Sequence, residues 1–146
     1  DQNGEYVFRR GYREYVNLKI DVDDASNEEE SLENCLEAIL AFKGEGQNVH
    51  SEIKKGTTAE KILEKVLEGR AYDLTGCKLS QVIYYYLAGQ NPILAKGENG
   101  YVLITGINGE EVTWYDPVSK STTKKTLTEA EKYFSEYGTE YIGYLD

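Results

Sequence analysis

The first candidate nucleophile is Cys35, which lies near the start of a predicted helix. Cys35 falls in the segment 31–44, SLENCLEAILAFKG, whose apolar residues recur at i, i+3, i+4, i+7 and i+8, the spacing of one buried helical face. This spacing predicts a helix with Cys35 in its first turn. A thiol near a helix N-terminus feels the positive end of the peptide dipoles, which favours the nucleophilic thiolate. A cysteine on an apolar face is also an ordinary core residue, so both interpretations stay open.

Two further side chains are candidates for acid–base chemistry. His50, the single histidine, lies in the polar segment 44–56, which we predict to be a surface loop. To act as a stand-in base for Cys35, His50 would need that loop to fold back along the helix. Asp116 precedes Pro117, a step typical of the turn that ends a strand, and this local role stands beside a catalytic one.

Composition excludes several classes of function. The net charge of −10, with the sixteen basic residues scattered, argues against a nucleic-acid partner. Apolar residues make up 40% and charged residues 29%, and no apolar run approaches the roughly 20 residues that span a membrane. Cys35 and Cys77 lack the spacing of a zinc site, and we expect two separate thiols. We predict no metal and no cofactor.

The elements that must position these side chains follow from periodicity. The N-terminal part, residues 1–30, is predicted to be an extended segment and an acidic connector: residues 5–22 are extended, with strand alternation from Val16, and the connector starts at residue 23. Helices are predicted at 57–69, boxed by Thr57 and Glu60, and at 78–88, and strands at 92–96 and 101–107. Asn108-Gly109 predicts a type I′ hairpin turn. Three further elements are predicted: a strand at 122–127, a helix at 128–137 with a capping box of Thr128 and Glu131, and a strand at 140–145.

This order of helices followed by strands predicts an α+β fold, with the helices packed on one side of an antiparallel sheet. The 146 residues suit a single domain. The sequence opens without methionine, and we expect it to be part of a longer protein.

Several phrases in this order carry a resemblance: NCLEAILAFKG, then GQNPILAKG, then YVLITGI, a turn, and a strand closing on WYDP. Together they resemble the papain-like cysteine peptidases of the bacteriocin-processing family. The resemblance covers residues 31–117 and, loosely, the remainder. It implies a papain-like fold with the cysteine-bearing helix first, and an extracellular or cell-surface location in a Gram-positive bacterium.

The resemblance also assigns roles to positions. It places the family's nucleophile on Cys35 and the acid that orients the catalytic histidine on Asp116. It places the histidine itself on Gly100 and the oxyanion-hole glutamine on Glu29. Glycine supplies no base, and a carboxylate would repel a developing oxyanion, so the usual chemistry would be close to abolished.

Two functions of different classes follow. The first is a catalytically degenerate peptidase-like domain, which binds a peptide or protein ligand or serves as a structural module in a larger exported protein. The second is an active cysteine hydrolase, a peptidase or amidase, that uses Cys35 with a base outside the family position. A third function is a surface that binds glycans, suggested by the thirteen tyrosines.

Overall fold

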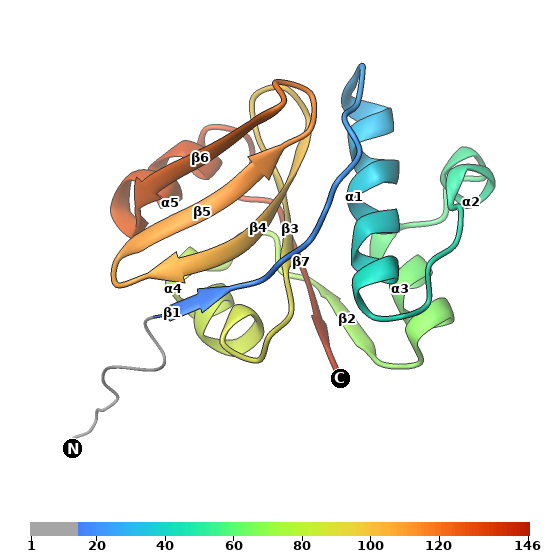
Figure 1. The fold of residues 1–146 in the computed structure, drawn as a ribbon, viewed down its shortest axis with the longest axis horizontal. Helices are drawn as coiled ribbons and strands as arrows, with labels where there is room; N and C mark the ends of the chain where they lie inside the picture. Colours follow the sequence, from blue (N-terminus) through green and yellow to red (C-terminus); the bar gives the residue numbers. More distant parts are fainter. Residues whose placement is uncertain (1–14) are drawn as a thin grey trace.

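The computed structural model describes residues 15–146 (Figure 1). The extended structure predicted for residues 5–14 lies outside the described residues. The predicted N-terminal strand is confirmed only as the three-residue β1 (Tyr15–Asn17), which pairs with β4 (Tyr101–Asn108). Residues 18–26, called the strap below, then lead without regular structure to the first helix. No helix among residues 15–146 is long and apolar enough to cross a membrane.

The helix that carries Cys35 is α1 (Glu28–Phe42), and it begins three residues before the predicted start. Asn27 is its N-cap, because the Asn27 side chain accepts a hydrogen bond from the Glu30 amide at 2.9 Å. Three glutamates in the first turn suit the positive end of the helix dipole. Cys35 therefore lies about two turns into α1, at 3.6 residues per turn, and not in its first turn as predicted.

The helices that follow differ from the prediction in detail. The segment predicted as a loop contains a short helix, α2 (His50–Lys54). The next helix, α3 (Ala59–Leu67), is capped by Thr58, because the Thr58 hydroxyl, and not that of Thr57, accepts from a first-turn amide. Neighbouring threonines make such one-residue errors easy.

A strand that we did not predict, β2 (Arg70–Asp73), follows α3. The helix predicted over 78–88 is confirmed as a helical segment, but it divides into one α-helical turn and one π-helical turn. These turns are α4 (Leu79–Val82) and η2 (Ile83–Leu87).

The second half of the chain is mostly strand, as predicted. Four strands pair antiparallel in sequence order: β3 (Ile93–Lys96), β4, β5 (Glu111–Asp116) and β6 (Ser121–Thr126). The last strand, β7 (Tyr141–Leu145), lies between β2 and β3. The sheet order is therefore β2-β7-β3-β4-β5-β6. The remaining element is the helix α5 (Leu127–Ser135).

The hairpin between β4 and β5 is shifted by one residue from the prediction. Asn108 pairs with Glu111, so the two turn residues are Gly109 and Glu110. Among these residues only Gly109 has positive φ, at 65°. Positive φ at the first turn position alone fits a type II′ turn, whereas a type I′ turn needs it at both.

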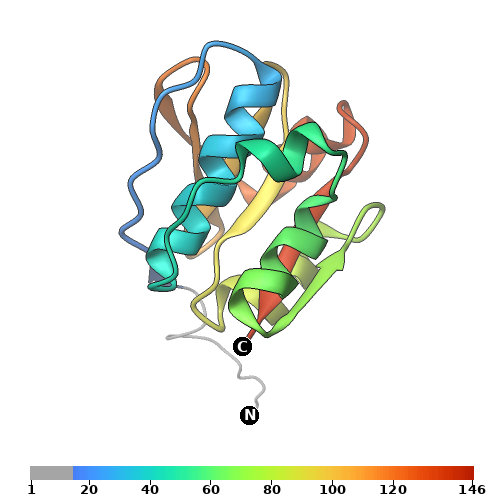
Figure 2. The ribbon, with the colours of Figure 1, turned by 90° about the vertical axis from the view of Figure 1, so that its right-hand side faces the viewer.

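The predicted α+β fold, with helices followed by an antiparallel sheet, is confirmed. Helices cover both faces of this sheet, however, so the prediction of one covered face is wrong. Figure 2 shows α1, α2 and α3 lying over one face, and in Figure 1 α4 and α5 lie behind the other. The physical reason is that β3 and β4 are apolar on both faces, so alternate residues enter two cores. Leu94 and Leu103 pack with Cys35 in one core, while Ile93 and Ile104 pack in the other.

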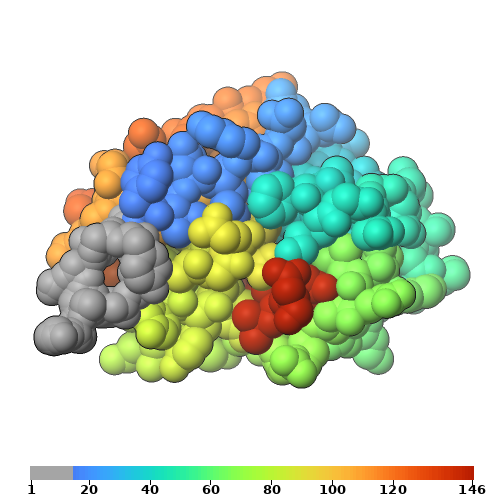
Figure 3. All heavy atoms as spheres, turned by 60° about the horizontal axis from the view of Figure 1, so that its bottom comes forward, coloured from blue at the N-terminus to red at the C-terminus, as the bar shows by residue number. Residues whose placement is uncertain are grey.

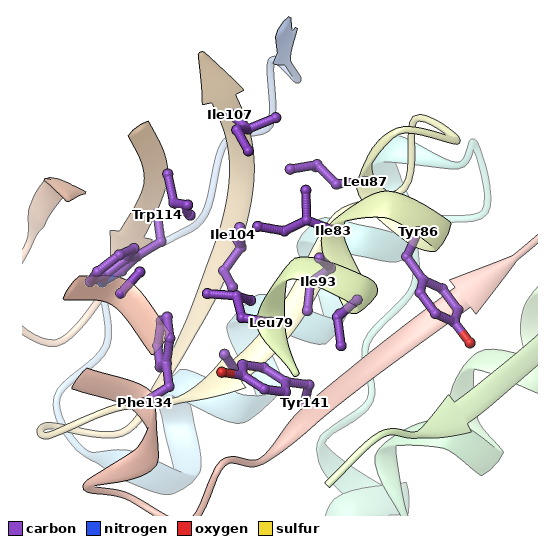
Figure 4. Packing of buried hydrophobic residues seen from close by; sticks show 14 of the residues in the cluster. Leu79, Ile83, Tyr86, Leu87, Ile93, Ile104, Ile107, Trp114, Phe134 and Tyr141 are labelled. Atoms are coloured by element: carbon purple, nitrogen blue, oxygen red, sulfur yellow. The ribbon is translucent and has the colours of Figure 1, made fainter. Parts of the chain in front are cut away.

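The second core is rich in aromatic rings (Figure 4). Phe134 of α5 packs against Trp114 of β5, with ring centroids 4.8 Å apart, and against Tyr141 of β7 at 5.7 Å.

The end of α1 is linked to Asp146 by an ion pair and to Asn91 by a hydrogen bond. Lys43 Nζ lies 2.5 Å from the Asp146 carboxylate and 2.7 Å from the Asn91 amide oxygen. Figure 3 shows these three segments meeting at the surface.

Candidate functional site

Cys35 lies in the core, away from solvent. Its side chain has no exposed surface, and its thiol lies 3.8 Å from the Tyr101 carbonyl oxygen, to which it donates a weak hydrogen bond. Burial raises the pKa of the Cys35 thiol far above its ordinary value, and the charge of Asp116 raises this pKa further. Burial of this kind favours the neutral thiol over the thiolate, and Cys35 lies about two turns from the positive end of the helix dipole.

The residue on α1 that faces the start of β4 is Ser31, one turn before Cys35. Ser31 is fully buried. Its hydroxyl donates to the Glu28 carbonyl oxygen at 2.6 Å and accepts from the Tyr101 amide at 2.8 Å. The hydroxyl therefore links the first turn of α1 directly to the first residue of β4.

Gly100, the position that the resemblance assigns to a histidine, lies against this serine. Its φ of +146° belongs to a region that residues with side chains rarely adopt. A Cβ atom at Gly100 would lie 2.6 Å from the Ser31 hydroxyl oxygen and 3.0 Å from the Glu28 Cα. A side chain at position 100 would thus clash with Ser31. The position that the resemblance assigns to the histidine is closely packed against the first turn of α1.

Asp116 lies beside the same loop, at the end of β5, and is 5% exposed. One carboxylate oxygen accepts from the Asn99 side-chain amide at 3.1 Å. The other accepts from the backbone amides of Val118 and Ser119, at 2.9 and 3.0 Å. Asp116 therefore binds the loop that ends in Gly100 and stabilises the turn after its own strand, the local role that its sequence context indicates.

His50 and Glu29 lie on the outer side of α1. His50, the exposed first residue of α2, has its Nδ1 atom 2.9 Å from the Glu33 carboxylate. Glu29 is half exposed and pairs with Lys54 at 3.1 Å. These two contacts fasten α2 to α1. Neither His50 nor Glu29 has a recorded polar contact with Cys35, Asp116 or Ser31 in the described part of the chain.

The structure thus brings Ser31, Asn99, Gly100 and Asp116 together, and we refer to these four residues as the corner. Cys35 lies one helical turn further along α1. Ser31 was missed in the sequence because the cysteine drew attention to the wrong turn of the helix. The signal that would have found it is the pattern Asn27 to Glu30, a capping signature that places the helix start at Glu28 and Ser31 in the first turn. Within residues 15–146, no group of histidine, cysteine and acidic side chains is arranged to hold a metal ion.

A comparison with solved structures identifies the fold. The chain matches the crystal structure of a provisionally assigned C39-like peptidase from Bacillus anthracis with a TM-score of 0.69, over 91% of this chain and 98% of that one. The chain has the fold of a C39-like peptidase. The sequences are 14% identical, so the likeness concerns the fold alone. No family model matches the sequence, and no curated protein matches it significantly.

Proposed function

We propose that this chain is a C39-like peptidase fold without peptidase chemistry, which serves as a binding or structural module of a larger protein. The observation that carries the proposal is the corner. Where the family resemblance calls for a base there is Gly100, packed against a serine hydroxyl whose donor and acceptor are both used within the protein.

The electrostatics support the same proposal. Cysteine peptidases need a thiolate and a base that are within hydrogen-bond reach of each other. Cys35 is held in its neutral form by burial, and its recorded polar contact is to a backbone carbonyl oxygen. The Asp116 carboxylate is occupied by one side-chain amide and two backbone amides. Each of these contacts stabilises the fold, and among residues 15–146 no imidazole or carboxylate has a recorded hydrogen bond to the Cys35 thiol.

The contacts within the corner also have a structural role. Removing a catalytic pair from a buried site would leave unpaired polar groups or a cavity, both of which are costly. Here Ser31 satisfies the Tyr101 amide, and the glycine lets the two segments approach closely. We extend the proposal to an exported or cell-surface location, which rests on the family resemblance in sequence alone and is tested by fractionating cells that produce the parent protein.

The test is a hydrolysis assay with two control variants. The protein is incubated with fluorescein-labelled casein and with peptides that contain a double-glycine step, beside the variants Cys35→Ala and Ser31→Ala. We expect the same background release from all three proteins. Release by the wild type that is abolished in Cys35→Ala would establish the alternative, an active cysteine hydrolase. Release abolished only in Ser31→Ala would make the corner a serine-dependent site.

A further inference from the structure

The strap encloses a hollow on the face of the sheet that α1 also covers. It is held to the sheet at both ends, because the Leu18 amide donates to the Thr105 carbonyl oxygen and the Ala25 amide donates to that of Pro117, each at 2.9 Å. Near the end that leads into α1, the Tyr115 hydroxyl donates to the Asp24 carboxylate at 2.5 Å. Figure 1 shows the strap running from β1 to α1 beside β4 and β5.

Between these anchors lies a cavity of about 390 Å³. That volume falls in the range of small-molecule sites, roughly 300–1,000 Å³. Its floor is made by side chains that alternate along neighbouring strands on the α1 side of the sheet, and the strap forms the facing wall. The lining residues that matter here are Thr105, Thr113 and Thr122 on the sheet, and Asn17, Ile20 and Asp21 on the other side.

The lining has a defined chemistry. The three threonine hydroxyls have no hydrogen-bond partner within the described part of the chain, and each is both a donor and an acceptor. Asn17 adds an amide and Asp21 a carboxylate, while Ile20 and Val22 supply apolar surface. Among the described residues, no lysine, arginine or histidine lines this cavity. An anionic ligand would therefore meet a carboxylate with no compensating cation.

We propose that this cavity binds a neutral, hydroxyl-rich ligand of one or two sugar rings. The inference deepens the binding role of the proposed function and rests on it. Sugar hydroxyls pair with threonine, asparagine and aspartate side chains, and the apolar patches of a sugar ring suit Ile20 and Val22.

A carbohydrate fits this cavity better than a peptide does. An extended peptide usually binds by adding a strand to a free sheet edge, where its amides find partners. The floor of the cavity is the face of β5, whose backbone is already paired with β4 on one side and with β6 on the other. Side-chain hydroxyls, and not strand amides, are therefore what this floor presents to a ligand.

The experiment is a titration of the isotope-labelled full chain followed by amide NMR shifts. The probes are four neutral disaccharides (cellobiose, maltose, lactose and N,N′-diacetylchitobiose), with digalacturonate as the anionic counterpart and trialanine as a peptide. We expect at least one neutral disaccharide to shift the amides of Thr105, Thr113 and Thr122 with a dissociation constant near the millimolar range. Digalacturonate is expected to bind more weakly than the neutral probes.

Variants make the test specific. Thr113→Val keeps the shape of the side chain and removes its hydroxyl, so we expect binding to weaken about tenfold, the equivalent of about one hydrogen bond. The matched control is Thr123→Val, on β6 beside Thr122. Thr123 does not line the cavity, so its loss should leave binding unchanged.

Three results would overturn the inference. They are the absence of shifts at these amides with every disaccharide at tens of millimolar, equal weakening by Thr113→Val and Thr123→Val, and shifts with trialanine alone, which would make the cavity a peptide site. None of them changes the casein assay, so failure of this inference and failure of the proposed loss of catalysis are distinguishable.

Discussion

Ser31 is the single residue on which the closed corner depends most. Its hydroxyl is the recorded partner of the Tyr101 amide at the start of β4. We predict that Ser31→Ala lowers the free energy of unfolding by about 1–3 kcal/mol, because a buried amide would be left without a partner. Urea denaturation followed by circular dichroism measures this change.

A second serine provides the control for that measurement. The Ser135 hydroxyl is exposed and donates to a carbonyl oxygen of its own helix, so Ser135→Ala should stay within about 0.5 kcal/mol of the wild type. Equal effects of the two substitutions would show that the Ser31 hydroxyl does not hold the corner together.

The sequence predicted the residues of the corner unevenly. Asp116 was located correctly at the end of a strand, because the Asp-Pro step is a strong local signal. Cys35 was predicted in the first turn of its helix but lies about two turns into α1, since residue type was given more weight than the capping pattern around Asn27. The approach of Gly100 to Ser31 joins segments far apart in the chain and leaves no local pattern to read.

The N-cap of α5 allows a direct test of how the helices begin. The N-cap of α5 is Thr126, whose hydroxyl accepts from the Glu129 amide while the Glu129 carboxylate accepts from the Thr126 amide. The sequence had suggested Thr128 with Glu131. We predict that Thr126→Ala destabilises the protein by about 1 kcal/mol and that Thr128→Ala, at an exposed first-turn position, is nearly neutral.

Thermal unfolding of the two variants distinguishes these capping assignments, and the reverse order of their melting temperatures would contradict the structure. The Glu131 carboxylate instead accepts from the Leu79 amide at 2.9 Å and so fastens α4 to α5. A pattern of two threonines and two glutamates at the same spacing could not be resolved by local sequence alone.

Elements with strong periodicity were predicted well, and short or ambiguous ones were not. α3, α5 and the strands β3, β4, β5 and β7 were found because their apolar residues repeat at the helical or strand period or form short apolar runs of strand length. β2 was missed because only Ala71 of its four residues is buried. The continuous apolar runs of β3 and β4 are typical of strands buried on both faces, and the prediction of one covered face did not use this signal.

The ion pair between Lys43, at the end of α1, and Asp146 leads to a prediction about the pH dependence of stability. A hydrogen bond from Lys43 holds the pKa of the Asp146 carboxyl below its usual range. A carboxyl whose pKa is lower in the folded than in the unfolded state stabilises the fold above the unfolded pKa, about 4, and loses this contribution as pH falls through the folded pKa.

Asp146→Asn should therefore be less stable than the wild type at pH 6, with the difference shrinking as pH falls below about 4. Urea midpoints of the two proteins across pH 2.5–7 check this, and a difference that grows toward low pH would contradict the sign. Because the Asp146 side chain is 63% exposed, high salt should also reduce the difference.

The central expectation for this C39-like fold is that Cys35 is not an activated thiol. The most direct measurement is the rate of iodoacetamide labelling of Cys35 between pH 5 and 9, in a Cys77→Ser variant that removes the exposed second thiol. We predict no labelling of the folded protein across this range and complete labelling after denaturation, since Cys35 is buried and its pKa is raised. Rapid labelling of the folded protein that persists down to pH 5 would reveal a stabilised thiolate and contradict the proposed loss of catalysis.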